Sequence, residues 1–141
     1  MRSTKFFIAL GILLSACTIE PVEINYGMDA CAFCTMTIVD RGHAAEYVSQ
    51  KGKAYKFDAI ECLARELQGS DDPAPALVLV ADYSQPGKLL SAHEAIIVRC
   101  EDIPSPMGEF LSAFPDSASL KRIIGKGSYE ILKWDEIEFE R

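Results

Sequence analysis

The first sixteen residues constrain this chain most, because they decide how much of it folds and in which compartment. A short basic start, Arg2 to Lys5, precedes an apolar run from Phe6 to Leu14, and small residues follow. That order is typical of a secretory signal peptide, and the apolar run is too short to span a bilayer as a helix. We therefore expect residues 1–16 to be removed. About 120 residues remain, enough for one compact domain or two small halves.

The residues around the expected cleavage site also predict a lipid anchor. Leu14-Ser15-Ala16-Cys17 resembles the bacterial lipobox, in which the cysteine is acylated and becomes the first mature residue. On this basis Cys17 carries several acyl chains, and two or more chains hold a protein firmly on a membrane. The alternative is ordinary cleavage after Ala16 to give a soluble protein. Thr18 stands where an aspartate would resemble an inner-membrane retention signal, which favours the outer membrane.

The charge balance excludes one class of partner. Removing residues 1–16 deletes Arg2 and Lys5 and no acidic residue, so the formal charge moves from −7 to −9. Nucleic-acid phosphates need Lys and Arg partners, so we expect no nucleic-acid binding. The same balance argues against a polybasic contact with anionic lipids. An acidic surface can steer a cation, although a solvated surface explains it better.

Three sulfur side chains within six residues give this chain its chemistry. Cys31, Cys34 and Met36 follow one another in the stretch Asp29–Ile38, and soft sulfur donors of this kind prefer Cu(I) to harder divalent ions. If residues 34–39 are extended, side chains two positions apart share a face, so we expect Cys34 and Met36 to point together. Cys31 then acts as a third donor or pairs with Cys34 in a disulfide.

The other cysteines leave further interpretations open. Cys31, Cys34, Cys62 and Cys100 remain once Cys17 is acylated, and in an oxidising envelope the default is disulfide bonding. A four-thiolate zinc site is a second interpretation, but Cys62 and Cys100 do not form a close pair. Thioredoxin-like redox chemistry is a third, although a strand-like run follows the Cys-x-x-Cys motif where a helix is usual. Spacing alone favours disulfide or structural cysteines over copper.

The alternation of turns and apolar residues predicts an α+β first half. A β-meander is expected from strands at 37–39, 44–49 and 54–57, with turns at 40–43 and 50–53. A helix follows over 60–67, with Asp58 as its N-cap and Gly69 as its stop. The apolar run 76–81 is typical of a buried return strand.

A similar order is expected in the second half. Residues 83–88 indicate a loop, helices are expected at 109–114 and 116–124, and strands are expected at 94–99, 130–134 and 137–139. We therefore predict an α+β fold of two small similar halves, each a β-meander with a helix and a return strand. The first half is residues 28–82 and the second is residues 83–141, after a lipidated tether over 17–27.

Several motifs together resemble one family. They are Asp29-x-Cys31-x-x-Cys34-x-Met36-x-Ile38-x-Asp40, Lys56-Phe57-Asp58-x-Ile60-x-Cys62-Leu63 and Ser105-Pro106-Met107-Gly108. With the lipobox, they are similar to the NosL family of copper-binding lipoproteins over most of the mature chain. The resemblance implies a Cu(I) carrier, not an enzyme, that supplies the copper centres of nitrous oxide reductase together with a membrane transporter complex. Thr35 stands where a glycine is common in that family, which stiffens the loop.

Carried over by position, the resemblance assigns Cys34 and Met36 as the ligand pair, with Cys31 as an extra donor or a redox partner. Met107 matches the second motif and is a candidate to close the site from the other half, although a methionine filling a core gap is equally common. His43 is near enough in sequence to offer a nitrogen ligand, but a histidine beside a turn glycine is usually solvated.

Two other functions stay open. One is a thiol–disulfide oxidoreductase using Cys31 and Cys34, and the other is a structural lipoprotein with disulfide-bonded cysteines. Cys62 is expected to be a buried, inert thiol on the apolar side of its helix, and no role follows for Cys100. No serine–histidine–acid arrangement, phosphate loop or carboxylate pair stands out, so hydrolytic enzymes are poorly supported.

Overall fold

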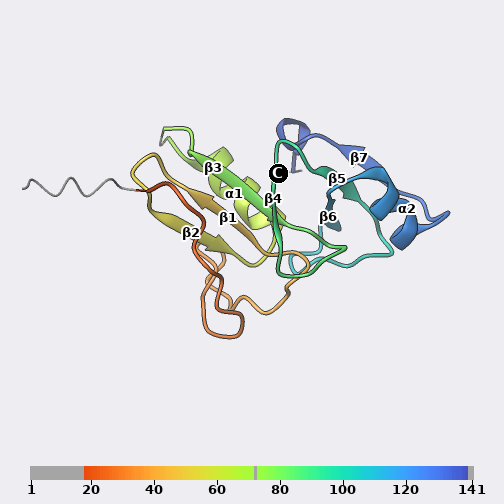
Figure 1. Cartoon of the computed structure of the whole chain (residues 1–141), viewed down its shortest axis with the longest axis horizontal. Helices are drawn as coiled ribbons and strands as arrows, with labels where there is room; N and C mark the ends of the chain where they lie inside the picture. Colours follow the sequence, from red (N-terminus) through yellow and green to blue (C-terminus); the bar gives the residue numbers. More distant parts are fainter. Residues whose placement is uncertain (1–17, 72, 140–141) are drawn as a thin grey trace, which may run out of the picture.

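The first half of the chain builds a four-stranded sheet. The computed structural model describes residues 18–71 and 73–139. Strands β1 (Ala45–Val48), β2 (Ala54–Phe57), β3 (Leu77–Ala81) and β4 (Leu89–Ser91) pair antiparallel in the order β2-β1-β3-β4. Helix α1 (Ile60–Gly69) packs against β1 and β2 (Figure 1).

The second half repeats this topology on a smaller scale. It contains β5 (Ile96–Arg99), β6 (Leu111–Phe114), helix α2 (Ser117–Ile124), β7 (Glu130–Leu132) and the short 3-10 helix η1 (Trp134–Glu136). The strand order is β6-β5-β7, so β5 lies between its hairpin partner and a return strand, as β1 lies between β2 and β3. The expected α+β fold of two similar halves is confirmed, and β4, from the range 83–141, extends the first sheet.

Each half buries its helix on its own sheet. Ile60 and Leu63 lie one turn apart on α1, share a face, and are fully buried against Phe57 of β2 and Val80 of β3. A smaller core lies between α2 and the second sheet, formed by Val98, Cys100, Ile103, Phe114 and Leu120. Helix α1, which carries Cys62, is therefore held by the larger of the two cores.

The predicted helix at 109–114 is wrong. Gly108 and Phe110 have φ angles of 78° and 61°, and this left-handed backbone interrupts a right-handed helix. The segment instead forms β6, whose four residues are all buried and pair with β5. The predicted strand at 137–139 is also absent, because Ile137 caps η1 and is buried in the first core.

The two helix starts differ in how well their caps were predicted. Helix α2 begins as expected at Asp116, whose carboxylate accepts a 2.7 Å hydrogen bond from the Ser119 amide, and it ends at Gly125. Helix α1 does not use Asp58, because Ala59 takes the N-cap position with no side-chain hydrogen bond. Asp58 is instead buried beside the start of the helix.

Residues 18–26, here called the strap, lie along the first sheet instead of forming a free tether. Within the strap, the Val22 amide donates a 2.7 Å hydrogen bond to Glu46 of β1, and Lys56 Nζ donates a 2.6 Å bond to the Glu23 carbonyl. Ile24 is buried in the first core. The predicted signal peptide and Cys17 lie outside the described residues, within which neither helix is long and apolar enough to cross a bilayer.

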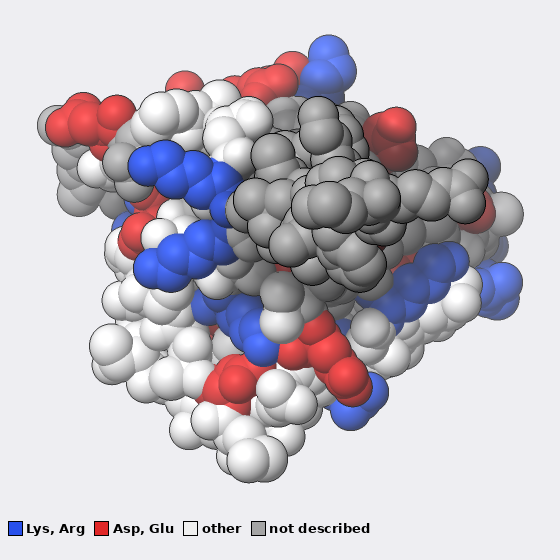
Figure 2. Space-filling model, turned by 60° about the vertical axis from the view of Figure 1, so that its left-hand side comes forward, with Lys and Arg blue, Asp and Glu red and all other residues white. Residues whose placement is uncertain are grey.

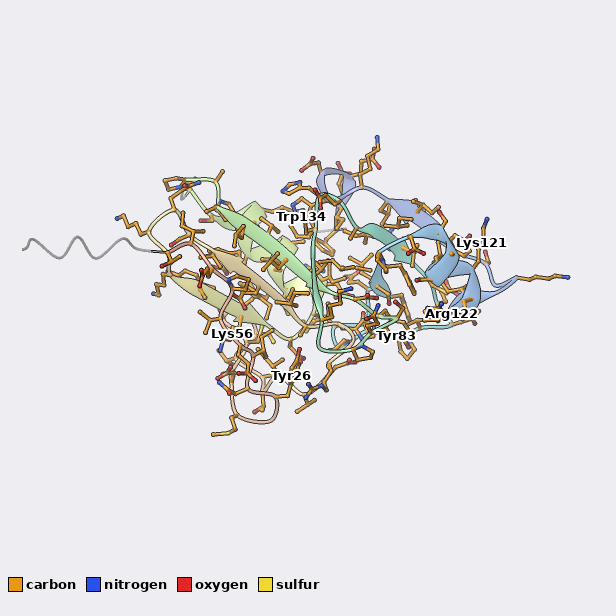
Figure 3. All side chains as sticks on the ribbon, in the orientation of Figure 1. Tyr26, Lys56, Tyr83, Lys121, Arg122 and Trp134 are labelled. Carbon is orange, nitrogen blue, oxygen red and sulfur yellow. The ribbon has the colours of Figure 1, made fainter. Side chains whose placement is uncertain are left out.

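A buried histidine links the two halves. His43 lies in the turn before β1, and its ring bonds Asp40 Oδ2 at 2.8 Å and Ser112 Oγ of β6 at 3.1 Å. Because the carboxylate only accepts, Nδ1 carries the proton and Nε2 accepts from the serine in the neutral ring. The Tyr83 ring contacts His43 and Phe114, and Figure 3 shows Tyr83 where the two halves meet.

Replacing Ser112 by alanine should test this link. The variant leaves the buried Nε2 of His43 without a hydrogen-bond partner, which we expect to lower the free energy of unfolding by about 1–3 kcal/mol. Urea denaturation measures the change. The control is Ser128→Ala at an exposed position, and equal stability of the two variants would contradict the role given to the serine.

Candidate metal centre

The sulfur motif lies on a closed loop at the end of β2. The Cys31 amide donates to the Met36 carbonyl at 2.8 Å, and the Thr35 amide donates to the Cys31 carbonyl at 3.0 Å. Ala32 donates to the carbonyl of Lys56 at 2.8 Å, which fastens the loop to β2. Residues 31–36, here called the sulfur loop, are the tip of a short hairpin whose arms meet in the Ala30–Thr37 bridge.

The expectation of an extended run over 34–39 is wrong. Thr35 has a φ angle of 64°, a left-handed conformation that is unusual for a β-branched residue. Residue 37 forms an isolated bridge with Ala30 and does not begin a strand of the first sheet. The argument that alternation along a strand aligns Cys34 with Met36 therefore does not apply.

Three thiols converge where the sulfur loop meets α1. The sulfur atoms of Cys31, Cys34 and Cys62 all lie within 4.8 Å of one another. Cys31 and Cys62 are buried, whereas Cys34 is partly exposed. Cys62 comes from the first turn of α1, so the expected buried thiol is confirmed, but its sulfur also belongs to the group. These three residues are called the thiol cluster below.

Hydrogen bonds to Cys31 favour its thiolate. The Cys62 thiol beside it has the largest effect and lowers the pKa of Cys31 to about 5, although burial works in the opposite direction. Backbone amides of Cys34, Asp58 and Phe33 also donate to the Cys31 sulfur, the first at 3.5 Å. Hydrogen bonds to the charged form of a group stabilise that form. These donors therefore favour the thiolate form of Cys31 over that of its two neighbours.

The pKa values of the other two thiols are shifted the opposite way. The hydrogen bond to the Cys31 sulfur is the main reason that the pKa of Cys62 is raised, and burial acts in the same direction. Burial is the main cause of the raised pKa of Cys34, partly offset by a hydrogen bond from the Met36 amide. The surroundings of Cys62 and Cys34 thus favour the neutral thiol, and Cys34 is the most exposed of the three.

Apolar side chains are exposed around this motif. On the segment that carries the sulfur loop, Met28, Phe33, Met36 and Val39 are 84%, 41%, 46% and 64% exposed. Met36 follows Cys34 by two residues, and its thioether lies in a half-exposed side chain. These four residues are called the apolar rim.

Two further predicted ligands, His43 and Met107, have other contacts in the fold. His43, expected to be solvated, is buried and uses both ring nitrogens in hydrogen bonds to Asp40 and Ser112. This is a serine–histidine–acid arrangement that sequence reasoning missed, but Ser112 is fully buried, so no substrate reaches it. Met107 is partly buried and packs against the first core.

The Ser105–Gly108 motif is tied to the helix that carries Cys62. The Ser105 hydroxyl donates to the buried carboxylate of Glu61, which also accepts from the Leu111 amide at 3.3 Å. The Phe110 amide donates to Ser105 Oγ at 2.9 Å. Because Glu61 directly precedes Cys62 in the first turn of α1, the second half of the chain braces the helix start at the thiol cluster.

The cysteines do not form the frameworks first considered. Cys31, Cys34, Cys62 and Cys100 are all free thiols in the described part of the chain. Cys100 is buried in the second core and is not part of the thiol cluster. The described residues therefore contain no four-cysteine site.

Comparison with known proteins decides the family. The NosL family pattern matches residues 21–141. The chain belongs to the NosL family. A solved structure described as the copper chaperone NosL from Shewanella denitrificans has a similar fold, with a TM-score of 0.71 at 20% identity over 85% of this chain and 96% of that one. No curated protein sequence gives a significant match.

For this NosL family member, Cys62 is the residue that sequence reasoning undervalued. Its sequence position beside Leu63, at apolar helical spacing, indicated only burial. Three-dimensional contact between the sulfur loop and the first turn of α1 brings it to Cys31. The available signal was the sequence Phe57-Asp58, which ends β2 and places the helix start beside the loop that β2 holds.

Thr35→Gly should stabilise the protein. A non-glycine residue in the left-handed region lowers the stability of the folded protein by about 1–3 kcal/mol. Glycine removes this cost, but it also gives the unfolded chain more conformational freedom, which offsets part of the gain. We expect the free energy of unfolding to rise by about 1 kcal/mol in urea denaturation. Thr37→Gly, at a bridge residue outside the left-handed region, is the control and should destabilise. A loss of stability in Thr35→Gly would contradict the strain.

The lowered pKa of Cys31 makes stability depend on pH. Because its pKa is about 5 when folded and 9.0 for an ordinary thiol, the unfolded chain binds more protons between these values. The contribution of this group to the free energy of unfolding therefore rises with pH from about 5 to 9, and it is lost as pH falls through about 5. Cys31→Ser should flatten the rise in urea denaturation under reducing conditions.

The matched control for this pH dependence is Cys100→Ser, which removes a buried thiol outside the cluster. It should keep the slope of the native chain even if its overall stability is lower. Identical slopes in the native chain and in Cys31→Ser would show that Cys31 is not a thiolate.

Proposed function

We propose that this chain is an envelope lipoprotein that binds Cu(I) and hands it to a copper enzyme, with nitrous oxide reductase as the favoured client. The observation that carries the proposal is the thiol cluster of Cys31, Cys34 and Cys62 in a chain of the NosL family. The description of the solved relative as a copper chaperone supports the same role. The lipobox at Cys17 supports anchoring toward the periplasm, and Thr18 favours the outer membrane.

The cluster suits a soft monovalent ion. A metal–thiolate bond is about 2.3 Å long in zinc sites. Three bonds of similar length to a trigonal Cu(I) ion would place the sulfurs roughly 4 Å apart. The three sulfurs already lie within 4.8 Å of one another, so little movement is needed. Sulfur ligands select Cu(I) over harder divalent ions. Cu(I) displaces thiol protons when it binds, and the Cys31 thiolate supplies the first charge without such a step.

We propose Cys34 and Met36 as the outer ligands and Cys31 with Cys62 as the inner ones. Cys34 is the most exposed thiol of the cluster, and Met36, two residues along the same loop, is half-exposed and carries a thioether that has no proton to lose, so it can bind over a wide pH range. His43 would have to release Asp40 or Ser112 to bind a metal, so it stays outside this set. Met107 packs against the first core and remains a prediction for closing the site.

Hand-over follows from the unequal burial of these ligands. An incoming donor can approach Cys34 and Met36 from solvent, bind the ion, and replace these two ligands before the buried thiols let go. Ligand exchange of this kind avoids free copper. The lipid anchor raises the effective concentration of the carrier near a membrane transporter complex and an envelope client.

A thiol–disulfide oxidoreductase is the second candidate, and one observation favours it. Cys31 has a pKa of about 5 and lies beside two further thiols, which is the arrangement of a reactive thiolate with resolving partners. Against this, Cys31 is only 2% exposed, so a protein disulfide cannot reach it without movement of the sulfur loop.

Competition titration of Cu(I) into a soluble form that begins at Thr18 tests the proposal. We expect one Cu(I) per chain and little affinity for Zn(II). Cys34→Ser should weaken Cu(I) binding by at least about tenfold, which is roughly 1.4 kcal/mol, because it removes the outer thiolate. Met36→Ala should weaken it less, since a thioether carries no charge.

Cys100→Ser is the control for these variants and should bind Cu(I) like the native chain, because its sulfur lies outside the cluster. Equal affinity in Cys34→Ser, Met36→Ala and the native chain would remove the copper assignment. Disulfide exchange that depends on Cys31 and Cys34 but not on Met36, together with weak Cu(I) binding, would support the oxidoreductase.

A further inference from the structure

The strap begins at one end of the first sheet and ends at the other. Its first residue, Thr18, lies at the β1–β2 turn, where a Cβ built on Gly52 would be 3.4 Å from the Thr18 carbonyl. Further along, the Glu23 carbonyl meets Lys56 at the far end of β2. The strap then leads directly into the hairpin that carries the sulfur loop. Figure 1 shows this path from the left end of the sheet to the orange loop at the bottom.

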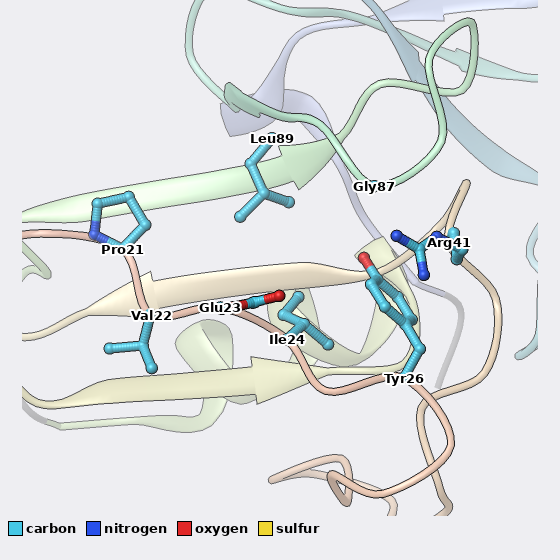
Figure 4. A pocket seen from close by; sticks show the side chains of 8 residues that line it. All are labelled: Pro21, Val22, Glu23, Ile24, Tyr26, Arg41, Gly87 and Leu89. Carbon is cyan, nitrogen blue, oxygen red and sulfur yellow. The ribbon is translucent and has the colours of Figure 1, made fainter.

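Several contacts hold the strap along its length. Glu46 is fully buried and accepts from the Val22 amide, while its second oxygen has no hydrogen-bond partner. Arg41 stacks on the Tyr26 ring at 4.5 Å. A cavity of about 150 Å³ lies between the strap and residues Arg41, Gly87 and Leu89 (Figure 4). The strap is thus bound to the sheet at its middle and at its end.

This arrangement separates Thr18 from the thiol cluster by the length of β2. Gly52 lies in the turn before β2 and Asp58 directly follows the strand, and the four residues of the strand at about 3.4 Å each span about 14 Å. The Asp58 amide donates to the Cys31 sulfur. The cluster therefore lies at the end of the first sheet opposite to the one where the described chain begins.

The described chain begins at this end with Thr18, which directly follows the predicted lipidation site Cys17 in the sequence. We propose that the β1–β2 turn rests on the bilayer surface, with the thiol cluster held about 14 Å away from it and directed to the periplasm. The surface consists of Gln50, Lys51 and Lys53 with the adjoining Pro73 and Ala74, here called the anchor face. This inference rests on acylation of Cys17, which is part of the proposed function.

The chemistry of the anchor face fits phospholipid head groups. Lys51 and Lys53 are exposed, and Gln50 Nε2 donates to the Ala74 carbonyl, which joins the turn to the neighbouring loop. Figure 2 brings this side forward and shows Lys and Arg interspersed with Asp and Glu. The mature chain has a formal charge of −9 as a whole. Exposed lysines also lie on and after α2, so the start of the described chain beside the β1–β2 turn, more than the two lysines, selects this end for contact.

Lysine acylation by a water-soluble reagent tests the placement. The full-length mature protein, carrying its lipid anchor at Cys17, is reconstituted in vesicles of phosphatidylethanolamine and phosphatidylglycerol. The lysines labelled by the reagent are then mapped by mass spectrometry. Lys51 and Lys53 should react several-fold more slowly than in the soluble form that begins at Thr18. Lys121 and Lys126, on and after α2, serve as internal controls and should react equally in both; Figure 3 shows Lys121 at the opposite end of the molecule.

A spacer variant isolates the role of the strap. Inserting a flexible Gly-Ser segment between Cys17 and Thr18 leaves the anchor and the thiol cluster intact but frees the body from the surface, so protection of Lys51 and Lys53 should disappear. Equal labelling of these lysines with and without vesicles would overturn the placement. Protection that persists in the spacer variant would also overturn it, because the short connection would then not set the orientation.

Two measurements on the same vesicles separate this inference from the proposed function. Intact mass reports the acyl chains, and competition titration reports Cu(I) affinity. An acylated protein that binds Cu(I) but leaves Lys51 and Lys53 unprotected overturns only the placement. A mass without acyl chains overturns the anchor and the placement together, whereas protection without Cu(I) binding supports the placement and removes the copper assignment.

Discussion

Hydrogen bonds to the buried Cys31 sulfur hold the candidate centre together. The Cys31 sulfur receives the Cys62 thiol and backbone amides from the sulfur loop and from Asp58. A buried anion without hydrogen-bond donors is costly. The groups that lower the pKa of Cys31 by donating to its sulfur also fix the position of the sulfur loop against α1. The centre is therefore arranged before any ion arrives, and the strained backbone at Thr35 is part of the cost of closing so tight a loop.

The two halves share a topology but contribute differently to the candidate site. The first half carries the thiol cluster, and the second half supports it from behind. Ser112 reaches the turn before β1 through His43, and Ser105 reaches α1 through Glu61, one residue before Cys62. Two halves of similar strand–strand–helix–strand order thus form the candidate site and its support. This gives the Ser105–Gly108 motif a structural role that does not depend on the behaviour of Met107.

The periodic parts of the chain were predictable because their signals are local. The helices at α1 and α2, the β1–β2 hairpin and the apolar strand β3 follow from spacing, turn residues and burial pattern. The helix expected at 109–114 failed because its apolar residues fit either period, and the left-handed backbone at Phe110 decided the outcome. A phenylalanine in the sequence gives no indication that its backbone adopts a left-handed φ angle.

The site was predictable in composition but not in geometry. Cys31, Cys34 and Met36 are soft donors, but their spacing alone favoured disulfide or structural cysteines, and the resemblance to the NosL family was needed to predict copper. Cys62 entered the cluster through a contact between segments about thirty residues apart, which periodicity along one helix cannot reveal. His43 was misjudged for the same reason, since its partner Ser112 lies 69 residues away. Local patterns describe elements, whereas sites form where distant elements meet.

The apolar rim has a consequence for which molecules could accept a metal ion if the proposed function holds. Met28, Phe33 and Val39 present hydrocarbon to water on the same segment as the sulfur loop. A small charged chelator that approaches there must shed part of its hydration shell and gains little in return, while a protein with a matching apolar patch releases ordered water from both surfaces. An exposed apolar surface on this segment would therefore favour macromolecular acceptors over dissolved chelators.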